Sequence, residues 1–380
     1  MTENSEKSIY RELQKHLDSQ PVGFPSVKSG ADIRFLKRMF SPREALLAQH
    51  LSWKYAGISH VMKTAVDDFK EEEAVELLQG LSMKGAIGFR EKGGETQWCL
   101  LPMIIGMYEA MDGIPDPEFI RDAQDYMNTL TFGKSLLAAQ PSQMRTIPIN
   151  ESLPVEHVVA DYSSIESLIR KSPGPFVVLP CICREGRKLK GQECDVTSRV
   201  ETCLGMGDTA KMVLARGHGR EIDRDEALKI LGQNQEDGLV LQPGNARDPE
   251  FICSCCGCCC GMLQLQKMIP RPVDFWTSHY RAEVTEDKCV GCGKCAQRCQ
   301  VNAVTVKEKL KKAVISRSRC IGCGICVAAC PAEAVRLVPL EDQDPPPGDS
   351  EELLETIMQN KKNGLERLVM TAKLILGMRQ

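Results

Sequence analysis

Several features that mark large protein classes are missing from this sequence. No stretch approaches the roughly 18 uninterrupted apolar residues of a membrane-spanning helix, so we expect none. The polar N-terminal segment MTENSEKSIY lacks the basic and apolar regions of a secretory signal, which predicts a cytoplasmic location. Neither a Gly-x-Gly-x-x-Gly loop nor a P-loop is present, so we expect no bound NAD, FAD or ATP.

An excess of charge of one sign is also absent. The 48 Lys and Arg residues face 51 Asp and Glu residues, and the formal net charge is -3. A protein that binds nucleic acid or an anionic membrane through charge usually shows a basic excess. We therefore expect no nucleic acid among the partners.

Cysteine is the residue in excess, with 19 among 380 residues. Cys99 stands alone in the first 180 positions, ten cysteines lie in 181–260, and eight lie in 289–330. In a chain without a secretory signal, clustered cysteines bind metal more often than they form disulfides. The length allows two or three domains, and the cysteine distribution indicates where to divide them.

The last eight cysteines have the spacing Cys-x2-Cys-x2-Cys-x3-Cys twice, and proline follows the second run. In this arrangement the first three cysteines of each run bind one [4Fe–4S] cluster, and the fourth binds the other cluster. The predicted ligands are Cys289, Cys292, Cys295 and Cys330 for the first cluster, and Cys299, Cys320, Cys323 and Cys326 for the second. Glycines beside them, such as Gly291 and Gly322, permit tight turns next to the metal.

Residues 281–340 therefore resemble a two-cluster bacterial-type ferredoxin domain. Segments 303–306 and 312–317 are predicted to be short strands joined by the turn KEKLKK. One position departs from the ferredoxin pattern, because Gln300 follows Cys299 where that pattern usually has proline. The departure removes no ligand.

Ten further cysteines lie in the middle of the chain. Residues 176–183 (FVVLPCIC) are predicted to be an extended strand, in which Cys181 and Cys183 share a face and can address one metal centre. One plausible ligand set is Cys181, Cys183, Cys194 and Cys203. A second centre, or ligands shared with the first, would come from Cys253, Cys255, Cys256, Cys258, Cys259 and Cys260. We expect one or two further iron–sulfur clusters here, with structural zinc bound by four thiolates as the alternative.

The layout of the middle region carries a second resemblance. The order PCICR, two further cysteines, GREIDRDEAL and ICSCCGCCCG is similar to that of uncharacterised 4Fe–4S dicluster proteins of anaerobes. In those proteins a helical N-terminal segment precedes a cysteine-rich middle. The resemblance covers most of the chain and implies electron transfer in an anaerobic setting, but it supplies no substrate.

The N-terminal region contains no metal motif. A helix start is predicted at Ser41-Pro42, further helices at 58–66 and 70–85, and a hairpin over 86–102 with its turn at Gly93-Gly94. This order resembles a winged-helix domain. Its third helix carries four glutamates, and residues 31–110 contain ten Lys or Arg against eleven Asp or Glu, so we expect protein rather than DNA as its partner.

The C-terminal tail follows a linker rich in proline and acidic residues. The tail is predicted to be helical with a break at Asn363-Gly364. Its apolar side comprises Leu365, Leu368, Val369, Ala372, Leu376 and Met378. Such a tail folds back on its own domain or docks on a larger oxidoreductase subunit. Its sparse basic residues make contact with a membrane surface a weaker alternative.

These patterns together predict a multidomain α+β protein. The predicted parts are an N-terminal arm (1–30), a winged-helix-like domain (31–140), a cysteine-rich α+β domain (141–280), a ferredoxin-like domain with two [4Fe–4S] clusters (281–340), a linker (341–350) and a C-terminal helical tail (351–380).

The function predicted from these parts is electron relay. The chain would exchange single low-potential electrons with a redox partner protein or with other subunits of an oxidoreductase complex, through two [4Fe–4S] clusters and a middle centre. Two alternatives remain open. A substrate-binding cluster in the middle region would make the chain an iron–sulfur reductase, and coupling of cluster oxidation to DNA contacts would make it a redox-sensing winged-helix regulator.

Overall fold

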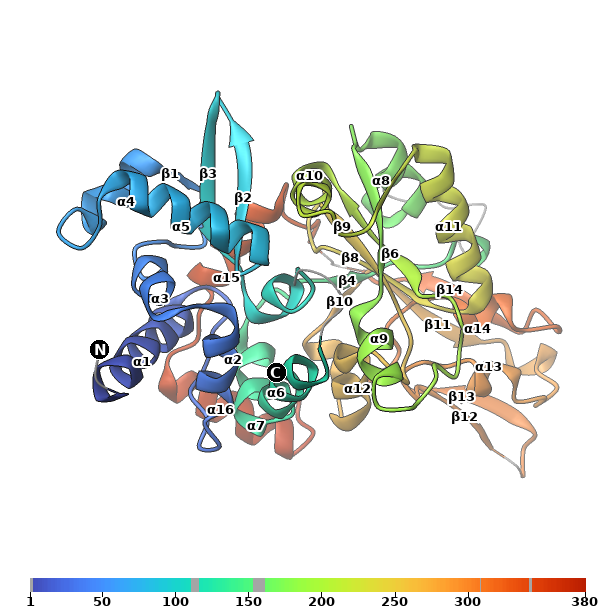
Figure 1. The fold of residues 1–380 in the computed structure, drawn as a ribbon. Helices are drawn as coiled ribbons and strands as arrows, with labels where there is room; N and C mark the ends of the chain where they lie inside the picture. Colours follow the sequence, from blue (N-terminus) through green and yellow to red (C-terminus); the bar gives the residue numbers. More distant parts are fainter. Residues whose placement is uncertain (1–2, 111–115, 153–160, 308, 342–343) are drawn as a thin grey trace. The chain divides into compact units, whose positions relative to one another are not determined.

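The computed structural model describes residues 3–110, 116–152, 161–307, 309–341 and 344–380 (Figure 1). Glu308 of the predicted turn and residues 342–343 of the predicted linker lie outside the described residues. The chain divides into two compact units. The first comprises Met1–Ala139, Lys211–Gly219 and Leu354–Lys362, and the second comprises Gln140–Ala210, Arg220–Leu353 and Asn363–Gln380. The second unit thus contains both the cysteine-rich and the ferredoxin-like segments, and the finer domain boundaries stay predictions.

The first unit consists of helices and a small sheet with strand order β1-β3-β2. Its elements are α1 (Glu3–Ser19), α2 (Ala31–Met39), α3 (Pro42–Ala48), β1 (Ala56–Gly57), α4 (Ile58–Ala65), α5 (Glu71–Lys84), β2 (Ile87–Lys92), β3 (Glu95–Leu100), the irregular turn η1 (Met103–Met107), α6 (Pro117–Met127) and α7 (Leu130–Ala138). The predicted start of α3 is confirmed, because the Ser41 hydroxyl accepts a hydrogen bond from the Glu44 N–H and Pro42 occupies the first turn.

The predicted order of helices and hairpin is confirmed in α3, α4, α5 and the β2–β3 pair. Gly93 and Gly94 form the hairpin turn with φ of 65° and 81°, a conformation that favours glycine. Cys99 on β3 is a buried thiol. The winged-helix assignment and a protein-binding role for this region stay predictions.

Aromatic side chains fill the core of the first unit. The Phe24 and Tyr126 rings lie 4.5 Å apart between centroids, and the Phe35 and Phe119 rings lie 5.7 Å apart. All four are almost completely buried. These contacts join α2 and α6, which are distant in sequence, through a single apolar cluster.

A five-stranded antiparallel sheet organises the second unit, with strand order β7-β5-β6-β9-β8. The strands are β5 (Phe176–Pro180), β6 (Glu201–Met206), β7 (Arg220–Ile222), β8 (Val240–Pro243) and β9 (Phe251–Cys255). Helices α8 (Ile165–Lys171) and α11 (Arg224–Asp237) pack together on one face of this sheet (Figure 1). That face contributes Val178, Leu204 and Ile252 to a buried apolar cluster.

The opposite face of the same sheet carries cysteines. Because side chains alternate along a strand, Cys203, Cys253 and Cys255 lie on the face away from Leu204 and Ile252. Gln242 on β8 stands directly opposite Cys253 on β9 and shares that face. Helices α9 (Ile182–Lys188) and α12 (Gly261–Met268) begin immediately after cysteines that follow β5 and β9.

The predicted strand over 176–183 is wrong in its last three residues. Strand β5 ends at Pro180, where the pairing register shifts because proline has no N–H for the ladder. Cys181 is the residue that precedes α9, and Cys183 lies in the first turn of that helix. A helix start therefore brings these two thiols together, not strand alternation.

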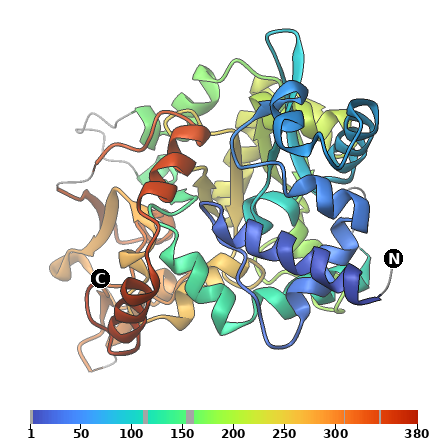
Figure 2. The ribbon, with the colours of Figure 1, turned by 90° about the vertical axis from the view of Figure 1, so that its left-hand side faces the viewer.

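The ferredoxin-like segment forms two strand pairs, β11 with β14 and β12 with β13. Its elements are β11 (Tyr280–Val284), α13 (Lys294–Gln297), β12 (Val304–Lys307), β13 (Lys312–Ile315), α14 (Ile325–Ala328) and β14 (Val335–Pro339). The two predicted strands are confirmed in β12 and β13. In both views this segment, drawn in orange, lies beside the five-stranded sheet (Figure 1 and Figure 2).

The remaining elements connect these parts. They are β4 (Arg145–Thr146), α10 (Gly207–Ala215), β10 (Thr277–Ser278), α15 (Ser350–Gln359), α16 (Gly364–Ile375) and the 3-10 turns η2 (Asn150–Ser152), η3 (Asp161–Ser163), η4 (Pro272–Asp274) and η5 (Glu286–Lys288). The predicted break in the tail is confirmed, because Asn363 caps the start of α16 by accepting a hydrogen bond from the Glu366 N–H.

Candidate metal centres

The first predicted ligand set surrounds a cavity in the ferredoxin-like segment. All four of its cysteines line that cavity, namely Cys289, Cys292, Cys295 and Cys330. Ala313 from β13 and Val335 from β14 close its sides. The fold thus places the fourth cysteine of the second run with the first three of the first run, as the crossed ligand pattern requires.

The second predicted ligand set lies deeper. Cys320 and Cys323 interact electrostatically with Cys299, which comes from the other run, and so does Cys326. Burial raises the pKa of the Cys323 thiol to about 12. A thiol in such surroundings keeps its proton until a metal displaces it, so metal binding here releases protons.

Backbone N–H groups point at the sulfur atoms of both sets. The Ala282 and Ala303 N–H groups donate to the Sγ atoms of Cys320 and Cys299 at 3.3 and 3.1 Å. The Ala313 and Ala334 N–H groups donate to Cys289 and Cys330 at 3.4 and 3.3 Å. Hydrogen bonds of this kind stabilise a reduced cluster and help to set its potential.

Two glycines allow the backbone to approach the clusters closely. Gly291 and Gly322 have φ of 68° and 67°, and a Cβ on either would collide with backbone atoms, of Lys311 and Tyr280 respectively. The expectation that glycine is needed beside the metal therefore has two reasons here, the conformation and the lack of space.

A separate group of four thiols lies in the cysteine-rich segment, and we call it the quartet. Its members are Cys194, Cys256, Cys258 and Cys259. The Cys194 Sγ lies 3.5 Å from that of Cys256 and 3.7 Å from that of Cys258, and the Sγ atoms of Cys258 and Cys259 are 3.6 Å apart. Spacing along the sequence suggested Cys194 as a partner of Cys181, Cys183 and Cys203, whereas the fold brings it to the turn between β9 and α12.

The spacing within the quartet matches ligation of one metal ion. Two thiolates that each lie about 2.3 Å from a tetrahedral zinc ion are about 3.8 Å apart, and can never be more than about 4.6 Å apart. All four Sγ atoms of the quartet lie within 4.8 Å of one another. Among the residues that the structure describes, no other group of three or more His, Cys, Asp or Glu side chains meets that limit.

Two arginines surround the quartet. Arg184 is 4% exposed, and its guanidinium lies 3.8 Å from the Cys256 Sγ. A hydrogen bond from Cys259 and the charge of Arg184 lower the pKa of Cys256 to about 5 in spite of burial. Arg187 donates to the Cys258 carbonyl at 2.5 Å and pairs with Asp195 at 3.1 Å, which fixes the loop beside Cys194.

The other six middle cysteines form a ring of side-chain contacts, which we call the six-thiol ring. Going round, its members are Cys181, Cys183, Cys260, Cys255, Cys253 and Cys203, and each interacts with its two neighbours. Contact with Cys183 lowers the pKa of Cys181, and contact with Cys181 raises that of Cys183. No disulfide is formed, and all six are free thiols.

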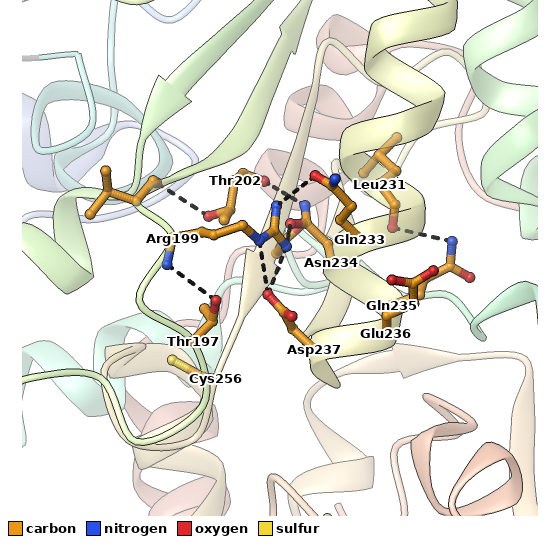
Figure 3. A network of polar contacts seen from close by, with 12 residues as sticks. Thr197, Arg199, Thr202, Leu231, Gln233, Asn234, Gln235, Glu236, Asp237 and Cys256 are labelled. Carbon is orange, nitrogen blue, oxygen red and sulfur yellow. Dashed lines mark hydrogen bonds and ion pairs between the residues drawn. The ribbon is translucent and has the colours of Figure 1, made fainter.

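A polar network fixes the strands that carry the ring (Figure 3). The buried Asn234 on α11 donates to the Thr202 carbonyl at 3.0 Å and to the Ser254 hydroxyl at 2.8 Å. Its own carbonyl accepts a hydrogen bond from Arg199 at 2.7 Å, and Arg199 pairs with Asp237 at 2.8 Å. Thr202 adjoins Cys203, and Ser254 lies between Cys253 and Cys255, so Asn234 holds β6 and β9 in place behind three thiols.

Gln300 connects the ferredoxin-like segment to the cysteine-rich turn. Its side-chain oxygen accepts a hydrogen bond from the Gly257 N–H at 2.7 Å. A Cβ on Gly257 would collide with the Gln300 backbone carbonyl, so glycine is required for this approach. The one departure from the ferredoxin pattern thus adjoins a turn that supplies three quartet thiols.

Residues 282–337 match the family described as a 4Fe-4S dicluster domain. No curated protein and no solved structure matches the chain. The matched residues include all eight cysteines of the two ferredoxin ligand sets. They do not extend to the quartet or the six-thiol ring.

The chain is therefore an iron–sulfur protein of the electron-transfer class, with a ferredoxin-like domain and a cysteine-rich region in which four thiols lie close enough together to hold a metal ion. Among the helices that the structure describes, none combines the length and apolarity that a membrane crossing demands. Several residues of these sites carried no sequence signal. Arg184, Asn234 and Gln242 acquire their positions only through contacts that are distant along the chain.

Proposed function

We propose that this chain is an electron-relay protein, working with a redox partner protein or within an oxidoreductase complex. Single low-potential electrons would enter or leave through the two clusters of the ferredoxin-like domain, and a metal centre in the cysteine-rich region would be the other end of the relay. The predicted ligands keep their roles: Cys289, Cys292, Cys295 and Cys330 for one cluster, and Cys299, Cys320, Cys323 and Cys326 for the other.

One observation carries this proposal, namely a shared apolar core. Cys253, Cys255 and Cys260 of the cysteine-rich region pack in the same cluster as Cys299, Cys320 and Cys323 of the second ferredoxin set. Val240, Ile321 and Ile325 belong to the same cluster, and all three are almost completely buried. A shared, buried apolar cluster brings the two cysteine-containing regions into contact, which supports electron exchange between them.

The contribution of the protein to such a relay would be control of potential. Backbone N–H groups at Cys289, Cys299, Cys320 and Cys330 stabilise the more negative, reduced clusters. Each set has one buried thiol, Cys295 or Cys326, but the first set also has an exposed one, Cys292, whereas no cysteine of the second set is exposed. We expect the more exposed first cluster to meet the partner, and the second cluster to face the cysteine-rich region.

The partner surface belongs to the same proposal. Helix α16 presents Leu365, Leu368 and Val369, all exposed, and its only described fully buried side chain is Met370. An apolar helix side of this kind suits docking on a larger oxidoreductase subunit.

An anaerobic redox titration followed by electron paramagnetic resonance tests the relay. We expect two [4Fe–4S] signals that each take up one electron, and a further one-electron step from the cysteine-rich region. After rapid mixing with a reductant, the third step should lag behind the ferredoxin steps. Turnover of a disulfide by the isolated chain with reduced viologen would instead support the reductase alternative and contradict a pure relay.

A further inference from the structure

We propose that the six-thiol ring binds one sulfide-bridged iron centre, distinct from the metal of the quartet. The ligands would be drawn from Cys181, Cys183, Cys203, Cys253, Cys255 and Cys260. This inference rests on the proposed relay and specifies its cysteine-rich end.

The spacing of the ring excludes a single bound ion. Each thiol interacts with two neighbours. However, no three of the six Sγ atoms lie within 4.8 Å of one another, because the quartet alone meets that limit among the described residues. Three thiolates on one zinc ion would all lie within about 4.6 Å. The same argument applies to two zinc ions, since each of them also needs three or four close thiolates.

Sulfide bridges remove this difficulty. In an iron–sulfur centre the thiolates bind different iron atoms, and inorganic sulfide joins the metals, so the thiolates stay apart. The ferredoxin sets show this wide spacing in the same chain, because their cysteines also fail the 4.8 Å limit. In the distances between its Sγ atoms, the six-thiol ring therefore resembles the ferredoxin sets and differs from the quartet.

The position of the ring suits a cofactor with several metal atoms. Two of its members precede helices, at α9 and α12, and three lie on adjacent strands of the sheet. Cys181, Cys255 and Cys260 are 5–8% exposed, so a centre held by them is shielded from water. Six thiols gathered without disulfides in such a place are otherwise unexplained by packing.

Gln242 is an independent indication of a ligand. The side chain is 0% exposed, and neither its amide oxygen nor its amide nitrogen has a hydrogen-bond partner. It stands directly opposite Cys253 on the face of the sheet that carries the ring. A buried amide without partners is costly, whereas its N–H group can donate to a cluster sulfide or thiolate.

The experiment is metal analysis of the anaerobically prepared full chain and three serine variants. Iron, acid-labile sulfide and zinc are measured per chain, and the ferredoxin signals are recorded by electron paramagnetic resonance. The ring variant combines Cys181→Ser, Cys203→Ser and Cys255→Ser and so leaves three ring thiols, fewer than a four-iron cluster needs. The quartet variant is Cys258→Ser with Cys259→Ser, and the control is Cys99→Ser in the first unit.

We expect about twelve irons in the natural chain, of which about eight belong to the ferredoxin domain. The ring variant should lose about four irons and keep both ferredoxin signals and its zinc. The quartet variant should lose the zinc and keep all irons, and Cys99→Ser should match the natural chain. About eight irons with intact ferredoxin signals would overturn the ring assignment and the third redox centre, and would leave the two ferredoxin clusters as the electron carriers. Missing ferredoxin signals would overturn electron transfer by this chain altogether.

A second variant covers the case in which the ring variant fails to fold. Gln242→Leu keeps all six thiols, so the iron content should be unchanged. Because the N–H donor is lost, the potential of the additional centre should fall while the two ferredoxin potentials stay constant. Gln233→Leu on the exposed side of α11 is the matched control. An unchanged third potential in Gln242→Leu would contradict a centre beside this amide.

Discussion

The quartet and the ferredoxin ligand sets are made of the same side chain and differ in two respects. The quartet thiols lie within 4.8 Å of one another, whereas the cysteines of the ferredoxin sets surround a wider space. The charge of the thiolates is also balanced differently, by Arg184 at the quartet and by backbone N–H groups at the ferredoxin sets. One chain therefore holds sites for a compact ion and for extended clusters, and the distances between thiols distinguish them.

The largest expected effect is the loss of a cluster from the ferredoxin ligand sets. Cys323→Ser removes one of four ligands of the second ferredoxin cluster, so that cluster should be lost with about four irons per chain. Iron and sulfide analysis measures the loss, and Cys99→Ser is the control. The quartet should keep its metal, and a simultaneous loss of zinc would show that the two kinds of site are not independent.

The next effect tests the single-ion character of the quartet. Cobalt supplied in place of zinc should bind at one ion per chain and give the visible absorption of tetrahedral thiolate coordination. Cys258→Ser should abolish that absorption, since an ion with three thiolates is bound more weakly. If Cys258→Ser instead removes about four irons per chain, the quartet holds a cluster. The distances between Sγ atoms would then not distinguish a single-ion site from a cluster site.

A smaller effect is expected from the charge at the quartet. Arg184→Met removes the cation beside Cys256 and its hydrogen bond to the Ser254 carbonyl, and it should weaken zinc binding about 10–100-fold. Competition with a chelator measures the affinity. Arg184→Lys keeps the charge and should restore part of it, whereas an equal loss in both variants would indicate a role in packing only.

The smallest effect concerns the frame behind the ring. Asn234→Ala removes two hydrogen bonds to β6 and β9 and leaves their buried partners unpaired, which should lower the free energy of unfolding by about 1–3 kcal/mol. Anaerobic denaturant unfolding checks this, with Lys229→Ala on the exposed face of the same helix, outside the network, as control. A change equal to that of the control would show that the network in Figure 3 adds no stability.

Most of the ferredoxin ligand sets could be predicted from the sequence, because three of the four ligands of each cluster are close together along the chain. Three cysteines within seven residues can surround one centre with only short turns between them, and strands β12 and β13 follow from their apolar pattern. The membership of the quartet was not predictable, because Cys194 and Cys256 are 62 positions apart in the sequence and only the fold brings them together.

The environment of the sites was hidden for the same reason. Arg184 is one of several basic residues after Cys183, and only the fold shows that it is buried against Cys256 while Lys188 and Lys190 are exposed. Nothing in the sequence distinguishes Gln242 from other strand residues. Only the pairing of β8 with β9 places it opposite Cys253. Long-range pairing, rather than local propensity, determines what surrounds a metal.

The contact between Gln300 and Gly257 makes the ferredoxin-like segment less portable than its motif implies. A ferredoxin with proline at this position, transplanted into the chain, would leave the Gly257 N–H without its acceptor. Gln300 therefore ties this domain to the cysteine-rich region of its own chain. A natural chain that keeps the dicluster motif but has proline here should also differ in the cysteine-rich turn.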